Sequence, residues 1–130
     1  MLKDIIKQFS DGKISGKELC KEIISHEPWH SLVHKSHGEQ KILFAEDQGQ
    51  QYTQLFSSQE LLNNYFQKID MNSDKTEITG EKLIKSAPEI FLEIINQPID
   101  FIDIDPGSEW ALHYTKDQFD LLKEMATSLL

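Results

Sequence analysis

The chain has 130 residues, with 22 acidic side chains against 13 lysines, no arginine and a formal charge of −9 at neutral pH. This length suits one domain, and an apolar content of 38% is typical of a folded globular chain and not of a disordered one. The acidic balance argues against nucleic-acid binding, because a phosphate backbone is bound mainly by clustered basic side chains.

The N-terminal part predicts two helices. Apolar residues at helical spacing indicate a first helix from Leu2 that ends at Asp11-Gly12. A second helix follows Ser15 and Glu18, a capping pair in which each side chain can satisfy a backbone N–H of the other. Cys20 lies on the apolar side of this helix, so we expect a packed, unreactive thiol.

The middle of the chain predicts a β-hairpin and a third helix. Lys41 to Glu46 and Tyr52 to Ser57 flank a turn at Asp47-Gln48-Gly49, the expected hairpin. The third helix begins behind a capping pair formed by Ser57 and Glu60. A short helical turn is expected from Glu81 to Lys85.

The last third continues with a fourth helix and two strands. The helix follows Ser86 and Glu89, with Pro88 in its first turn, where the missing N–H costs nothing. Ile99 to Asp105 is rich in β-branched residues and predicts one strand. The alternating stretch from Trp110 to Tyr114 predicts another.

A final helix behind Thr115 and Gln118 completes the series. Helices interleaved with strands, with at least one hairpin, predict an α+β fold. We expect a single compact domain over residues 1–130, with helices packed on a mixed or antiparallel sheet of four to five strands.

Three segments resemble the SseB N-terminal-domain family, the enhanced serine sensitivity type. Gln51 to Leu61 resembles its strand-to-helix signature, and Asp11 to Ser15 is similar to the turn between its first helices. Asp105-Pro106-Gly107-Ser108 resembles its Asn-Pro-Gly-Ser turn, with Asp105 where the family prefers Asn; either side chain can close an Asx-type turn. The resemblance covers nearly the whole chain and implies an SseB-like domain over 1–130 with no established catalytic role.

Negative charge is concentrated near the C-terminus, because residues 86–130 hold nine acids and two lysines. The candidate partner-binding residues are Asp100, Asp103, Asp105, Glu109 and Trp110. Strand alternation predicts that Asp103 and Asp105 share one face and that Asp100 points to the other. An acidic surface of this kind can steer a basic partner, whereas a purely solubilising face is the alternative interpretation.

Two patterns could bind a cation. Asp70, Asn72, Asp74 and Glu81 match the ligand positions of a calcium loop, although Lys75 stands where the sharp turn needs Gly. A solvated polar loop is the alternative there.

The second pattern is a histidine cluster: His26, His30, His34 and His37 are spaced four, four and three residues apart. Pro28 interrupts the helix that would place them on one face, and a strand over Ser31 to His34 would leave His30 and His34 together. Exposed histidines in loops and at strand ends are the alternative to a transition-metal site.

The compartment expected from the sequence is the cytoplasm. Cys20 is the only cysteine, so no intrachain disulfide can form. No apolar run is long enough to span a bilayer, and Lys3, Asp4 and Lys7 interrupt any signal-peptide core.

No phosphate-binding glycine loop and no Ser-His-Asp arrangement is recognisable in the sequence. We therefore expect a non-catalytic interaction or adaptor module that needs no cofactor and binds an unidentified, basic protein. The alternatives are a divalent-cation-binding protein, using the loop 70–81 or the histidines, and an immunity-type inhibitor of a basic partner. The sequence leaves the oligomeric state open.

Overall fold

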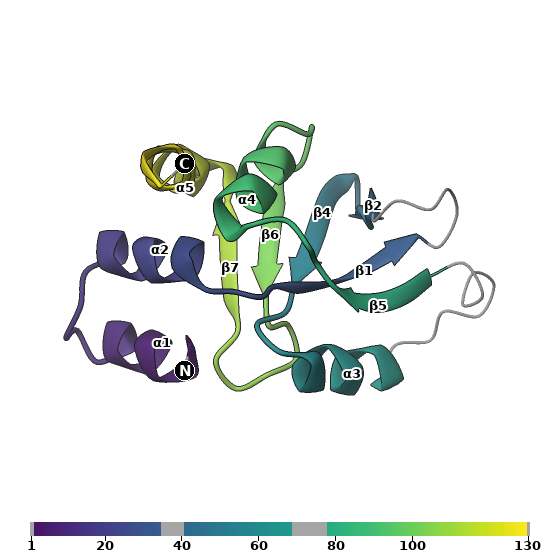
Figure 1. Ribbon diagram of the computed structural model, residues 1–130, viewed down its shortest axis with the longest axis horizontal. Coiled ribbons are helices and arrows are strands. Elements are labelled where there is room, and N and C mark those ends of the chain that lie inside the picture. The colour runs from purple at the N-terminus through teal and green to yellow at the C-terminus, as the bar shows by residue number, and fades with distance from the viewer. Residues whose placement is uncertain (1, 35–40, 69–77, 130) are drawn as a thin grey trace.

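The computed structural model describes residues 2–34, 41–68 and 78–129. In chain order its elements are α1 (Leu2–Ser10), α2 (Gly16–Ser25), β1 (His30–His34), β2 (Lys41–Ile42), β3 (Ala45–Asp47), β4 (Gln50–Leu55), α3 (Gln59–Lys68), β5 (Ile78–Lys82), α4 (Ala87–Ile95), β6 (Phe101–Ile104), β7 (Leu112–Thr115) and α5 (Lys116–Ser128). They form one small α+β domain, as the sequence predicts (Figure 1). No helix within the described ranges has the length and apolarity needed to cross a membrane.

The strands form two sheets. The expected mixed sheet has four strands in the order β3-β4-β6-β7, in which β4 and β6 are parallel and the other neighbours antiparallel. A second, antiparallel sheet with the order β2-β1-β5 was not predicted. The sheets meet at one bridge, where the backbone N–H groups of His30 and Phe56 each donate to the other residue's carbonyl at 2.8 Å.

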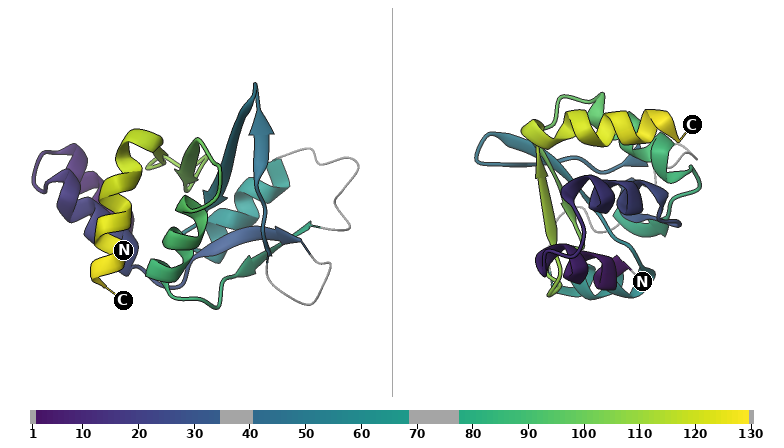
Figure 2. Two further views of the ribbon diagram at one scale, coloured as in Figure 1. Left: turned by 90° about the horizontal axis from the view of Figure 1, so that it is seen from above. Right: turned by 90° about the vertical axis from the view of Figure 1, so that its left-hand side faces the viewer.

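A layer of helices covers one face of the four-stranded sheet. α2, α4 and α5 pack against one another, and α1 packs against α2. Figure 2 (right) shows α1, α2 and α5 on the same side of β6 and β7. α3 packs on β1 and β5 of the other sheet.

The core lies between the helical layer and the strands. Ile102 and Ile104 of β6 are fully buried, and burial of side chains of this size stabilises a fold by about 1.5–3 kcal/mol each. Cys20 of α2 is also buried, as predicted, and its Sγ donates to the hydroxyl oxygen of Tyr114 on β7 at 3.8 Å. Burial raises the pKa of the Cys20 thiol, and the contact with Tyr114 lowers it in part.

Local capping explains the helix starts. The Ser15 hydroxyl accepts the N–H of Glu18 at 3.1 Å and begins α2 as predicted. The predicted cap at Ser57 is wrong: α3 begins at Gln59, and the Ser58 hydroxyl accepts the N–H of Leu61 at 3.2 Å.

Two other expectations need correction. The predicted helical turn from Glu81 to Lys85 is instead the end of β5 and its exit, because the backbone through Lys82 pairs with β1. The hairpin exists, but its turn is only Gln48-Gly49, with φ of 51° and 82°, the left-handed values that a tight two-residue turn requires. Lys41–Ile42 leaves the hairpin and pairs with β1.

Candidate functional site

Asp105 ties together two segments that are far apart in the sequence. It follows β6 directly, is 4% exposed and has a φ of 50°, a left-handed conformation that Asp and Asn tolerate better than most residues. Its Oδ1 accepts the backbone N–H of Ser57 at 2.7 Å, and its Oδ2 accepts the Ser57 hydroxyl at 2.7 Å. Burial raises the pKa of the Asp105 carboxyl, and the two hydrogen bonds from Ser57 lower it in part.

The same residue closes the turn into the connection between β6 and β7. The Asp105 carbonyl accepts the hydroxyl of Ser108 at 2.7 Å and its backbone N–H at 3.1 Å. Gly107 has a φ of 82° inside this turn, a conformation open to glycine at little cost. The turn is therefore held rigidly against the start of α3.

His26 approaches the same cluster from the end of α2. Its Nε2 lies 2.9 Å from the carbonyl oxygen of Ser57, so Nε2 must carry the proton that it donates. The Ser57 hydroxyl donates to Asp105 and not to His26. The three residue types of a catalytic triad are thus close together, but their hydrogen bonds do not run in the order that activates a serine.

A pocket of about 450 Å³ opens beside this cluster. Its walls come from the N-terminal end of α1, the first turn of α3 and the connection between β6 and β7. In Figure 1 this connection lies at the bottom of the molecule, between the N-terminal ends of α1 and α3. The volume is in the range of pockets that bind a side chain or a small molecule.

The pocket has an aromatic wall and an acidic lining. Trp110 is half-buried and lines it together with Glu60, Glu109 and the buried carboxyl of Asp105. Among the described residues that line the pocket, Lys3 is the one lysine. The acids therefore outnumber the lysine, and this arrangement favours a cationic group held against the indole ring.

Three of the five predicted partner-binding residues meet in this pocket: Asp105, Glu109 and Trp110. The sequence-based reasoning missed the participation of Glu60 and His26, which were assigned to a helix cap and to a metal site. Only a long-range contact brings these side chains to the pocket, and no local pattern marks such a contact.

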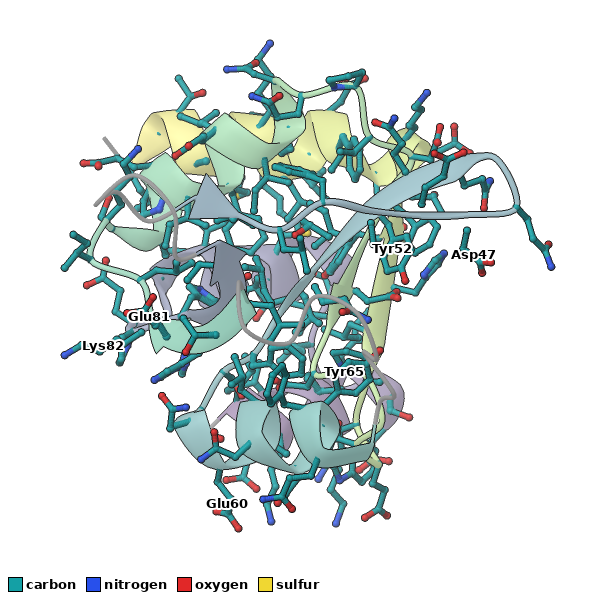
Figure 3. The ribbon with its side chains drawn as sticks, turned by 90° about the vertical axis from the view of Figure 1, so that its right-hand side faces the viewer. Asp47, Tyr52, Glu60, Tyr65, Glu81 and Lys82 are labelled. Atoms are coloured by element: carbon teal, nitrogen blue, oxygen red, sulfur yellow. The ribbon has the colours of Figure 1, made fainter. Side chains whose placement is uncertain are left out.

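Neither candidate cation site is assembled in the part of the chain that the structure describes. Asp70, Asn72, Asp74 and His37 lie outside the described residues, as does the His34 side chain. Glu81 is exposed on β5 beside Lys82 (Figure 3). No group of three or more His, Cys, Asp or Glu side chains able to hold a metal occurs among the described residues.

His30 is buried on β1, and its Nδ1 has no hydrogen-bond partner among the described residues. Burial lowers the pKa of its imidazole; a backbone hydrogen bond at Phe56 raises it in part. Burial therefore favours the neutral ring of His30 inside the core.

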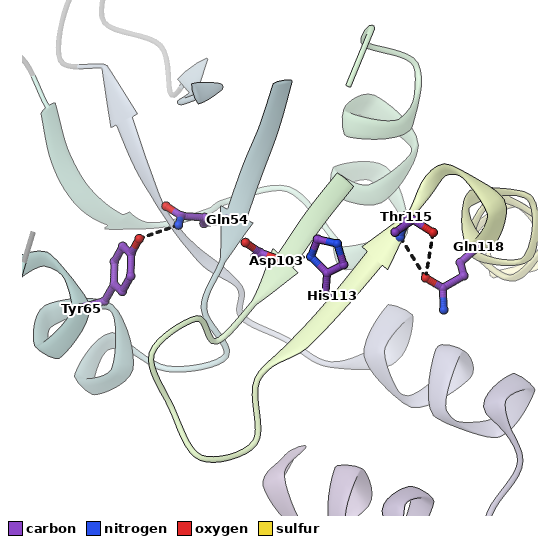
Figure 4. A network of polar contacts seen from close by, with 6 residues as sticks. All are labelled: Gln54, Tyr65, Asp103, His113, Thr115 and Gln118. Atoms are coloured by element: carbon purple, nitrogen blue, oxygen red, sulfur yellow. Dashed lines mark hydrogen bonds and ion pairs between the residues drawn. The ribbon is translucent and has the colours of Figure 1, made fainter. Parts of the chain in front are cut away.

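Asp100 and Asp103 are not part of the pocket. Asp100 accepts the backbone N–H of Gln51 at 2.9 Å and pairs with Lys116 at 3.0 Å; these contacts lower the pKa of its carboxyl. Asp103 lies 2.7 Å from Nδ1 of His113, across β6 and β7 (Figure 4). The prediction that Asp103 and Asp105 share a strand face is wrong, because β6 ends at Ile104 and the positive φ of Asp105 turns it into the core.

Comparisons of the chain with known protein-family models and with curated proteins found no match. The resemblance to the SseB N-terminal-domain family therefore stays a prediction.

Proposed function

We propose that this domain is a non-catalytic protein-interaction module of the SseB-like kind, and that it binds a basic segment of a partner protein. Its binding site would be the pocket lined by Lys3, Glu60, Asp105, Glu109 and Trp110, here called the Trp110 pocket. The observation that carries this proposal is that Trp110, Glu60 and Glu109 line the same concave site.

The chemistry of the pocket favours a lysine or arginine side chain as the bound group. A cation over the face of an indole ring is attracted by the ring quadrupole, and nearby carboxylates add to this attraction. Tryptophan is also among the residues that contribute most to binding at protein interfaces. A net charge of −9 would speed the approach of a basic partner.

The hydrogen bonds beside the pocket support a non-catalytic role. The Ser57 hydroxyl is engaged by Asp105, and His26 donates to the Ser57 carbonyl, so neither group is arranged to activate a nucleophile. The turn at Asp105-Pro106-Gly107-Ser108 supports the SseB-like assignment, because it is one of the three segments on which the resemblance rests. A cytoplasmic location is part of the proposal and is supported by the single buried thiol of Cys20.

The proposal can be tested by NMR titration with a short peptide of alternating lysine and glycine. The chain has two tryptophans, so the indole N–H signal of Trp110 can be assigned with a Trp110→Phe variant. We expect this signal and the amides of residues 57–61, 105 and 107–110 to shift in a saturable way. An acidic peptide of the same length should cause no such shifts.

A pair of charge-matched variants separates a specific site from general attraction. Glu60→Gln with Glu109→Gln removes two acids from the pocket, whereas Asp120→Asn with Glu124→Gln removes two exposed acids from α5. We expect the first double variant to weaken peptide binding about five- to tenfold and the second to change it much less. Equal weakening by both variants, or shifts located elsewhere, would contradict the proposal.

A further inference from the structure

The four-stranded sheet has a second face, away from the layer of α1, α2, α4 and α5 (Figure 2, right). Helix α3 reaches one end of this face, where the side-chain amide of Gln54 donates to the hydroxyl oxygen of Tyr65 at 2.7 Å (Figure 4). On β6 the buried residues Ile102 and Ile104 alternate with the partly exposed Phe101 and Asp103. Phe101 and Asp103 therefore project to the side away from the helices, together with the residues paired to them in register on β4 and β7.

Three aromatic rings form a row across this face. The Tyr52 and Phe101 rings stack almost in parallel, with centroids 4.7 Å apart and an interplanar angle of 6°. The His113 ring lies 4.7 Å from Phe101 on the other side, tilted by 42°. The three residues come from β4, β6 and β7 and are here called the aromatic row. All three are at least partly exposed to solvent.

Carboxylates flank the row. Asp103 lies on β6 between the rings and α3, and its Oδ1 contacts Nδ1 of His113. Asp47 is exposed at the end of β3, and Figure 3 shows it on the same side of the hairpin as Tyr52. Burial raises the pKa of the Tyr52 hydroxyl, and electrostatic interactions with Tyr65, Asp47 and Asp103 raise it further.

We propose that the aromatic row is a binding site for an arginine side chain of a partner protein, separate from the Trp110 pocket. Tyr52 and Phe101 cover each other's inner ring faces, so a planar guanidinium group can stack on the outer face of Tyr52, on the side of its β3 partner Ala45. There its N–H groups can donate to Asp47, which follows Ala45 by two residues on the same strand. Asp47 supplies complementary charge at the Tyr52 end of the row, whereas Lys116 lines the hollow at the His113 end. These 130 residues contain no arginine, so none of them can supply such a group.

The site differs from the Trp110 pocket in position and in chemistry. Phe101 begins β6, whereas Asp105 follows its end, so the two sites lie at opposite ends of that strand. The outer face of the Tyr52 ring suits a planar group, whereas the concave pocket suits either type of cationic side chain. Each site can therefore be present without the other.

The test is an NMR titration with the capped tripeptides Gly-Arg-Gly, Gly-Lys-Gly and Gly-citrulline-Gly. We expect the arginine peptide to shift amides around Tyr52, Phe101 and His113 and to bind about three- to fivefold more tightly there than the lysine peptide. The citrulline peptide has the same shape without the charge and should cause no saturable shifts. Equal shifts by arginine and lysine, or no shifts at the row, would overturn the proposal.

Variants separate this proposal from that for the Trp110 pocket. Tyr52→Leu keeps an apolar side chain on the strand, and Asp47→Asn keeps its shape; each should weaken arginine binding at the row at least about threefold. Tyr52→Phe retains the ring and should bind as the unchanged chain does. Trp110→Phe should leave the shifts at the row intact, so failure at one site is distinguishable from failure at the other. Native spectra of all variants verify the fold.

Discussion

The Ser57 hydroxyl and backbone N–H both donate to the Asp105 carboxylate, each over 2.7 Å, and join residues 48 positions apart in the chain. This carboxylate is buried, so its removal leaves two donors without an acceptor. We expect Asp105→Ala to lower the free energy of unfolding by about 2–4 kcal/mol. Urea denaturation followed by circular dichroism measures this loss.

Asp105→Asn is the matched control. The amide oxygen can accept the Ser57 N–H, the Ser57 hydroxyl can accept from the amide, and Asn tolerates the positive φ of this position. We expect a change of less than about 1 kcal/mol. If Asn and Ala were equally destabilising, the carboxylate charge and not the hydrogen bonding would hold the turn.

The raised pKa of Asp105 predicts that the free energy of unfolding depends on pH. Burial raises the pKa of folded Asp105 above the value of about 3.9 in the unfolded chain, so the folded state binds this proton more tightly. Its stabilising contribution is complete below the unfolded pKa and is lost as the pH rises through the folded pKa.

The measurement compares the free energy of unfolding of the unchanged chain with that of Asp105→Asn at several pH values. Because Asn does not titrate, the unchanged chain should become less stable relative to the variant between about pH 4 and neutrality. A relative gain over that range would mean that the hydrogen bonds from Ser57 outweigh burial.

Gly80 on β5 packs so closely against α3 that a larger residue should destabilise the fold. A Cβ atom at this position would overlap the buried side chain of Leu62 on α3. We expect Gly80→Ala to destabilise the fold by about 1–3 kcal/mol in urea denaturation, because a filled core yields only with strain.

Gly16, at the start of α2, is the matched control. An added Cβ there would meet only Phe9, at an ordinary distance of 3.8 Å. Gly16→Ala should be neutral or stabilise by up to about 1 kcal/mol, since alanine lowers the entropy of the unfolded chain. A neutral Gly80→Ala would show that α3 can move away from the sheet at little cost.

We expect the thiol of Cys20 to react slowly with thiol reagents in the folded chain. Burial both hides the thiol and raises its pKa, so little of the reactive thiolate is available. The native chain should react with Ellman's reagent at least about a hundredfold more slowly than the chain in denaturant. Gln97→Cys adds an exposed thiol and should give one equivalent of fast reaction. Fast reaction of the native chain itself would be evidence against a packed Cys20.

Local chemistry was predicted well and long-range contacts were not. The Ser15 and Glu18 pair lies within one helical turn, so its capping box could be recognised directly. Ser57 has the same pattern, but its hydroxyl is taken by Asp105, a partner that no local spacing indicates. Glu81 and Lys82, predicted to begin a helical turn, belong to a strand because β1 supplies their hydrogen bonds, which again depends on distant residues.

In the candidate site, too, local features were predicted and long-range contacts were not. Glu109 and Trp110 were found because they are sequence neighbours in an acidic, aromatic stretch. Glu60 was not, because it reaches the pocket only through the attachment of α3 to the turn at Asp105. The prediction that Asp105 shares a strand face with Asp103 failed for one reason. Asp105 has a positive φ, which the alternation of side chains along a strand cannot anticipate.

The walls of the Trp110 pocket come from residues near 2, near 57–61 and near 105–110, and the link between Ser57 and Asp105 is what brings the second and third together. Synthetic fragments of this chain, each containing one wall, would therefore lack the cavity altogether. A molecule that binds in this pocket would therefore bind the folded chain and not an unfolded or truncated one. Binding there depends on the same contact between Ser57 and Asp105 that holds the two walls together.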